Sequence, residues 1–162
     1  MNRFESLNTT GKVALVTAAL LASSTCWAEP TTADKLALMA RLEVMLEHTR
    51  DVEDIYLRNC QSVNPEIGQL MQAHRQPVTL ALNRVHKLSS KYSTRLANEW
   101  GQERAAATSQ AIQAGQAQWR KSFQAANSKD EAEHNFDCLK DPSTLANVPP
   151  DMDAILSQLE AD

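Results

Sequence analysis

Hydrophobic residues recur every three to four positions along most of the chain, which is the period of an amphipathic α-helix. The pattern predicts long helices over about residues 31–59, 64–100 and 102–127, and a short helix over about 151–160. No stretch shows the alternation of polar and apolar residues that is typical of a half-buried β-strand. The sequence therefore predicts an all-α protein, an antiparallel bundle of three to four helices.

Capping signals support these boundaries. Thr31 or Thr32 is a suitable N-cap for the first helix. Asn64 followed by Pro65 predicts the start of the second helix. Pro77 lies inside the second pattern, so it either kinks one long helix or separates two shorter ones.

The apolar positions of the first helix are more numerous than one stripe requires. The main stripe comprises Leu38, Leu42, Met45, Val52 and Tyr56. Flanking apolar residues are Met39, Val44, Leu46 and Ile55. We expect this helix to be buried against more than one neighbour, or against a partner. The third helix has a periodic face of Ala105, Thr108, Ile112, Gly115, Trp119, Phe123 and Ala126.

Residues 1–28 have the features of a secretory signal peptide. Arg3 and Lys12 precede the uncharged apolar stretch of residues 13–22, and Cys26 and Ala28 occupy the positions that signal peptidase reads. The apolar stretch is much shorter than the roughly 20 residues that span a bilayer. Lipidation of Cys26 is the alternative, although the preceding residues lack the Leu that usually opens a lipobox.

Removal of this segment leaves residues 29–162, a length suited to one domain. We expect this domain to be periplasmic or secreted, with no permanent membrane anchor. Its two cysteines, Cys60 and Cys138, are expected to form a disulfide in an oxidising compartment. An up-down-up arrangement of three long helices brings both cysteines to the same end. The bridge would stabilise the fold by roughly 4 kcal/mol in the chain-entropy model, and two separate buried thiols are the alternative.

Four cations in the second helix lie three or four residues apart and would form one stripe. They are Arg84, Lys87, Lys91 and Arg95. Residues 122–162 carry nine acidic and two basic residues, so this acidic quarter is the expected internal partner of the stripe. The alternative is a docking face for an acidic protein or another anionic component of the cell envelope.

A second charged stripe, on the first helix, comprises Glu43, Glu47, Asp51 and Asp54. It lies opposite the main apolar stripe of that helix, so it is expected to face solvent.

No constellation in the sequence predicts a metal site or a cofactor. The histidines lack an H-E-x-x-H motif, and no C-x-x-C-H haem attachment site is present. His48 with Asp51, and His134 with Asp137, have a spacing that could place two metal ligands on one helix face. Met45 could ligate a haem, but a Met in an apolar stripe more often packs a core.

The sequence also lacks a nucleophile elbow. An enzyme inside the bundle would need a buried Arg or Glu, and Arg50 or Arg58 turning inward would favour that alternative. The mature chain has 14 basic and 19 acidic residues, an acidic balance that disfavours nucleic acid as a partner. We therefore expect a non-catalytic, exported protein-binding module of adaptor, chaperone-like, inhibitor or immunity type. Its expected partner is an envelope protein, of acidic character if the basic stripe docks it, and a homodimer would also bury the wide apolar set. The alternatives are a bundle that binds a small ligand, metal or haem, and a small secreted enzyme.

Overall fold

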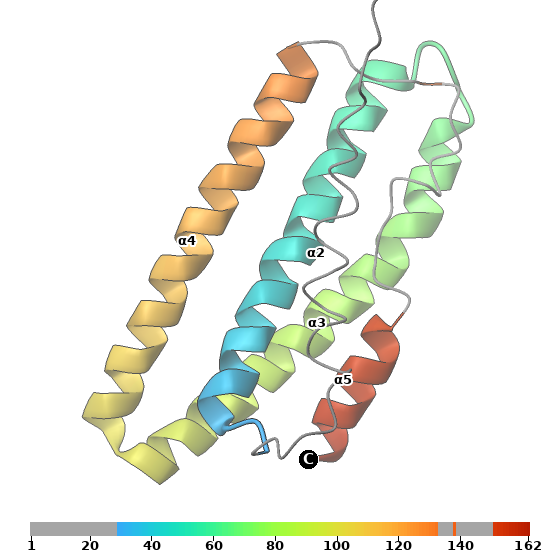
Figure 1. Ribbon diagram of the computed structural model, residues 1–162. Coiled ribbons are helices and arrows are strands. Elements are labelled where there is room, and N and C mark those ends of the chain that lie inside the picture. The colour runs from blue at the N-terminus through green and yellow to red at the C-terminus, as the bar shows by residue number, and fades with distance from the viewer. Residues whose placement is uncertain (1–28, 133–137, 139–150) are drawn as a thin grey trace, which may run out of the picture.

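The computed structural model describes residues 29–132, 138 and 151–162, and the predicted signal peptide lies outside these residues. The described helices are α2 (Thr32–Cys60), α3 (Ile67–Trp100), α4 (Gln102–Ala132) and α5 (Met152–Ala161) (Figure 1). The described residues contain no strand. The all-α prediction is confirmed, and the predicted helix boundaries hold to within a few residues except at the end of α4.

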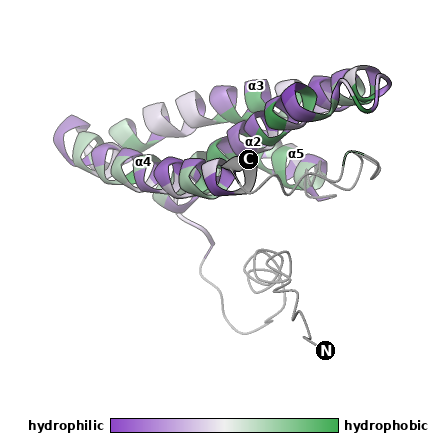
Figure 2. Cartoon of the chain, turned by 90° about the horizontal axis from the view of Figure 1, so that it is seen from above, coloured by the Kyte–Doolittle hydropathy of each residue, from purple (hydrophilic) through white to green (hydrophobic). Residues whose placement is uncertain are grey.

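The helix α2 lies at the centre of the bundle. The three long helices run alternately up and down, and α2 contacts both α3 and α4 (Figure 1). Seen from above, α3 and α4 lie on either side of α2 (Figure 2). The short helix α5 packs against α3.

Most of the apolar core lies between α2, α3 and α5. It includes Met39 and Leu46 of α2, Val85 and Leu96 of α3, and Leu156 of α5, all of which are almost fully buried. A second, smaller cluster at the far end of α2 contains Cys60, Ile67 and Met71.

The disulfide predicted between Cys60 and Cys138 is present, with the two Cα atoms 5.2 Å apart. Cys138 contacts the smaller apolar cluster, and its carbonyl oxygen accepts a hydrogen bond from Asn64 Nδ2 at 3.4 Å. The bridge therefore ties the C-terminal quarter of the chain to the turn between α2 and α3.

The ends of the helices follow local sequence signals in one case and depart from them in another. Thr31 caps α2 in a reciprocal capping box with Asp34, as predicted. The helix α3 begins at Ile67, three residues after the predicted start at Asn64, and the Asn64 side chain accepts a hydrogen bond from the Glu66 amide at 3.1 Å. The helix α3 continues through the exposed Pro77 as one element.

Burial on α2 differs from the prediction. Of the main predicted stripe, Leu42 is buried, whereas the other four residues are half-buried. The flanking apolar residues are the buried ones instead. The reason is that α2 has a neighbour on each side, so its buried surface is two faces and not one stripe.

The expectation that the acidic stripe of α2 faces solvent is wrong for Glu43 and Glu47. Arg120 of α4 donates through Nε to Glu47 Oε2 at 2.7 Å and through Nη2 to Glu43 Oε1 at 3.4 Å. His86 of α3 approaches Glu43 from the other side, with Nε2 3.5 Å from Oε1. The stripe lies between two neighbouring helices because α2 is central.

The predicted apolar face of α4 is also partly wrong. Trp119 and Ala126 are exposed, whereas the polar Gln116 is buried. Its Nε2 donates to the carbonyl oxygen of Ala40 at 3.2 Å and to Glu43 Oε2 at 3.0 Å. Polar contacts of Gln116 and Arg120 therefore help to hold α4 to α2. No helix in the part of the chain that the structure describes is long and apolar enough to cross a membrane.

A buried carboxylate, Glu53, lies on α2 opposite α3. It is 2% exposed, and neither carboxylate oxygen has a hydrogen-bond partner among the described residues. Its nearest cation is Arg75, whose Nε is 3.6 Å from Glu53 Oε2 and which also pairs with Asp54. Burial raises the pKa of Glu53, and the attraction of Arg75, His74 and Arg50 opposes this only in part.

We expect Glu53→Gln to increase the free energy of unfolding at neutral pH, by about 1 kcal/mol, because a neutral amide costs less to bury than a charged group without hydrogen bonds. Since the folded pKa is raised above the ordinary value of 4.5, the wild-type protein should gain stability as pH falls through the folded pKa, and the variant should lose this gain. Urea unfolding near pH 5 and near pH 8 measures both effects, with the exposed Glu103→Gln as the control. A variant less stable than wild type at both pH values would show that Arg75 compensates the charge fully.

Candidate functional site: the groove that holds α5

The helix α5 presents one apolar side to the bundle. Met152, Leu156 and Leu159 are buried in the main core, and Ile155 is half-buried against it. A ten-residue helix is shorter than the roughly 12–15 residues at which isolated helices become stable in water. The surface that receives α5 therefore supplies most of its stability.

One flank of α5 is held by Arg84 of α3. The guanidinium donates through Nη1 to Asp153 Oδ1 at 2.6 Å and through Nε to Glu160 Oε1 at 2.8 Å. Its Nη2 donates to Ser157 Oγ and to Glu160 Oε2, both at 3.1 Å. These three residues of α5 are four and three positions apart, so they share one helix face. Arg84 therefore contacts two turns of α5 at once.

The C-terminal end of α5 is surrounded by donors and cations from two helices. Tyr92 Oη donates to the carbonyl oxygen of Leu159 at 2.9 Å, and Lys91 Nζ is 3.5 Å from the carbonyl oxygen of Glu160. Lys35 of α2 pairs with the Asp162 carboxylate. Positive charge near these carbonyl groups is favourable, because the last carbonyls of a helix lack partners within the helix.

Arg95 completes this end of the groove. Its Nη1 is 3.5 Å from Asp162 Oδ2, and its Nε donates to Glu99 Oε1 at 2.9 Å. We name the surface made by Lys35, Arg84, Lys91, Tyr92 and Arg95, with the apolar floor below them, the α5 groove.

The charges of the groove shift the pKa values of the groups they contact. The hydrogen bond from Arg84 holds the pKa of Glu160 below its ordinary value, and Lys35 does the same for the pKa of Asp162. Burial, aided by the charge of Asp162, raises the pKa of the Tyr92 phenol. The phenol therefore stays a hydrogen-bond donor, and the two carboxylates stay charged at neutral pH.

Acid is expected to release α5 before the rest of the protein unfolds. Because the folded pKa values of Glu160 and Asp162 are lowered, their stabilisation is complete above the ordinary values of 4.5 and 3.8 and is lost as pH falls through the folded values. Amide NMR signals of α5, followed from neutral pH to about pH 3, should shift before those of α2. Simultaneous loss of both sets of signals would show that α5 has no separate transition.

The structure brings together three of the four predicted stripe residues. Arg84, Lys91 and Arg95 contact α5 or Asp162, so the expected pairing with the acidic quarter of the chain is confirmed. Lys87 is exposed, and its charge contributes to the lowered pKa of Glu160. Docking of a separate protein on the stripe stays a prediction.

The sequence interpretation missed Lys35 and Tyr92 as groove residues. The apolar periodicity of α3 places Tyr92 in the core, and its ring is indeed fully buried while its hydroxyl reaches α5. The sequence signal for Tyr92 was its position next to Lys91, which places a phenol beside the basic stripe. No sequence signal pointed to Lys35, because its contact with Asp162 joins residues 127 positions apart in the chain.

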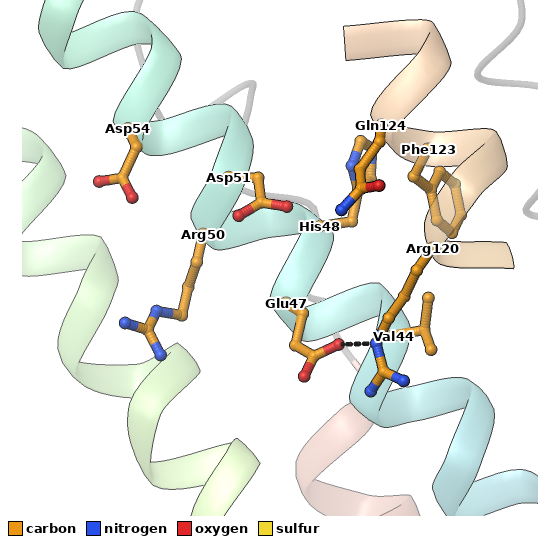
Figure 3. A pocket seen from close by; sticks show the side chains of 9 residues that line it. All are labelled: Val44, Glu47, His48, Arg50, Asp51, Asp54, Arg120, Phe123 and Gln124. Atoms are coloured by element: carbon orange, nitrogen blue, oxygen red, sulfur yellow. Dashed lines mark hydrogen bonds and ion pairs between the residues drawn. The ribbon is translucent and has the colours of Figure 1, made fainter. Parts of the chain in front are cut away.

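A second hollow lies between α2 and α4, with a volume of about 400 Å³ (Figure 3). The rings of His48 and Phe123 stack there with centroids 4.2 Å apart, and Asn127 Nδ2 lies 3.3 Å from His48 Nδ1. Burial lowers the pKa of His48, although the charge of Asp51 opposes this. Arg120 of α4 forms an ion pair with Glu47 of α2, with Nε 2.7 Å from Oε2 (Figure 3).

The sequence spacing pairs His48 with Asp51 as potential metal ligands. Among the described residues, no three His, Cys, Asp or Glu side chains form a group that could hold a metal ion. The other predicted pair, His134 with Asp137, lies outside the described residues. Arg50 and Arg58, whose inward turn would favour the enzyme alternative, are exposed, whereas Glu53 of α2 is buried.

Comparison with known proteins adds no relationship: no protein-family model, no curated protein and no solved structure matches the chain. The groove and its contacts are therefore the basis for a functional proposal.

Proposed function

We propose that this protein is an exported protein-binding module of the cell envelope, and that the α5 groove binds an acidic amphipathic helix of a partner protein. The observation that carries the proposal is the way α5 itself is held. Cations from α2 and α3 surround the acidic flank and the C-terminal end of a short helix whose apolar side fills the floor. Helix-in-groove recognition uses these same elements, an apolar helix face with flanking polar contacts.

The pattern of α5 defines the chemistry of the partner helix. Its apolar anchors are Met152, Leu156 and Leu159, and its acids at Asp153 and Glu160 lie next to the first and last anchors. A partner helix with apolar residues at this spacing and carboxylates beside them would reproduce the ion pairs of Arg84. Charge complementarity of this kind favours specificity and fast association.

Because α5 occupies the groove, a partner helix must replace it. The tether to the rest of the chain keeps α5 at an effective concentration on the order of millimolar, as for other short linkers. A partner must therefore bind the groove more tightly than α5 does, or carry additional contacts. The predicted signal peptide and the disulfide support the expectation that this takes place in the periplasm or outside the cell.

Capture from an envelope extract tests the proposal. The mature, oxidised protein should retain a partner protein, and a free peptide with the sequence of residues 151–162 should release it. Arg84→Glu should lose the partner at least tenfold, since the reversed charge repels an acidic helix, whereas Lys121→Glu on the exposed side of α4 should retain it. Circular dichroism establishes that both variants are folded. Retention by Arg84→Glu, or failure of the peptide to compete, would exclude the α5 groove as the binding site.

A further inference from the structure

We propose that α5 is exchangeable between two copies of this chain, and that a reciprocal dimer, in which each α5 occupies the groove of the other copy, forms when the contact of α5 with its own groove is weakened. This inference rests on the proposed function, because it requires a groove that accepts a helix from another chain. The occupant is a second copy, since the fit of α5 to the groove is present in the structure.

The length of the connection to α5 allows the exchange. The last described residue before Asp151 is Cys138, which is fixed to Cys60 near Ile67. The twelve residues 139–150 join it to Asp151, and an extended chain of this length reaches about 40 Å. From Ile67 to Arg84 along α3 is about 25 Å at 1.5 Å per residue. The reach of these twelve residues therefore exceeds the distance along α3 from Ile67 to Arg84, where α5 is held in its own chain.

The contacts of α5 are of a kind that a second copy can supply unchanged. They consist of side-chain packing, the Arg84 hydrogen bonds, and the donors at the C-terminal end. Each contact joins α5 to α2 or α3, and none depends on both partners belonging to one chain. Exchange of an identical element between protomers is a low-cost route to a dimer, because the same interactions hold the element in either arrangement.

Concentration decides which arrangement prevails. A tethered α5 has an effective concentration on the order of millimolar for its own groove, so the wild-type protein should be monomeric at micromolar concentration. The dimer should prevail when the contact within one chain is made unfavourable and the contact between chains is not.

Charge reversal on opposite sides of the groove creates this situation. One variant carries Arg84→Glu, and the other carries Asp153→Lys with Glu160→Lys. Each alone places like charges between α5 and its own groove. In an exchanged pair both grooves are matched, because the acidic groove of the first variant receives the basic α5 of the second, and the basic groove of the second receives the acidic α5 of the first.

Light scattering after size-exclusion chromatography of the mixed variants at micromolar concentration gives the result. We expect a one-to-one heterodimer in the mixture, with monomers for a chain carrying all three substitutions, in which the charges are matched internally. A mixture that stays monomeric would overturn the exchange. If a free α5 peptide still binds the groove in that case, the proposed function stands and only the inference fails; if it does not, both fail.

Discussion

Breaking the disulfide between Cys60 and Cys138 is expected to lower the free energy of unfolding by about 4.5 kcal/mol, the chain-entropy estimate for a loop closed over 78 residues. The bridge ties the α2–α3 turn to the chain segment that leads to α5, so its loss also weakens the small cluster of Ile67 and Met71. Urea unfolding of the protein with and without reductant, and of the Cys60→Ser, Cys138→Ser double variant, measures this effect.

The double variant separates the loss of the covalent bond from side effects of the reductant, because it should not respond to reductant at all. It should also hold α5 less firmly, since the connection between α5 and the bundle becomes longer and the effective concentration falls. Equal stability of the oxidised and reduced protein would show that the apolar contacts alone define the α2–α3 end.

The second large effect is expected for Leu156→Ala, which should weaken the packing of α5 on the bundle by about 2–5 kcal/mol of free energy. Leu156 is fully buried at the centre of the α5 face that meets the core. Because α5 is too short to persist alone, a loss of this size should release the whole helix and leave α2, α3 and α4 in place. Hydrogen exchange should then rise in residues 151–162 and stay low in the centre of α2.

Ala154→Gly is the matched control for this variant, because Ala154 is exposed on the opposite side of α5. It should cost only the helix propensity of one residue, about 1 kcal/mol. If both substitutions raise exchange equally, α5 is held by its polar contacts and not by its apolar side. If Leu156→Ala unfolds the entire protein, α5 is an integral part of one cooperative core.

The sequence predicted those features that depend on neighbouring residues or on the alternating direction of successive helices. Apolar periodicity placed the four helices of the described residues, the Thr31 cap marked the start of α2, and the up-down-up order brought Cys60 to Cys138. Pro77 illustrates the limit of local signals, since its position allowed a kink or a break and the helix continues past it.

Features that depend on which helices become neighbours were predicted less well. The acidic stripe of α2 was assigned to solvent because a single apolar stripe was assumed to face the core. The actual position of α2 between two helices places Glu43 within reach of His86 and Arg120. Gln116 on α4 is buried for the same reason, because a buried polar side chain is acceptable where a carbonyl and a carboxylate accept its hydrogen bonds.

The basic stripe includes contacts that the sequence predicted, and it lies beside one contact that the sequence did not predict. Its spacing identified the cations that hold α5, and the charge of the C-terminal quarter identified their internal partner. Sequence alone provided no reason to add Lys35, because its contact with Asp162 requires α2, α3 and the end of α5 to converge. The structure shows that three of these cations hold α5, and the binding of a helix from another protein at the same surface stays a proposal.

The most direct test of this groove is a binding titration with a fluorescent peptide of residues 151–162. The host is the full oxidised chain carrying Leu156→Ala, in which the native α5 competes weakly. We expect saturable binding that weakens with added salt, falls at least tenfold when Arg84→Glu is added, and is unchanged when Lys121→Glu is added. Absence of binding, or equal binding by the Arg84→Glu host, would contradict the proposal that the groove accepts an acidic amphipathic helix from another chain.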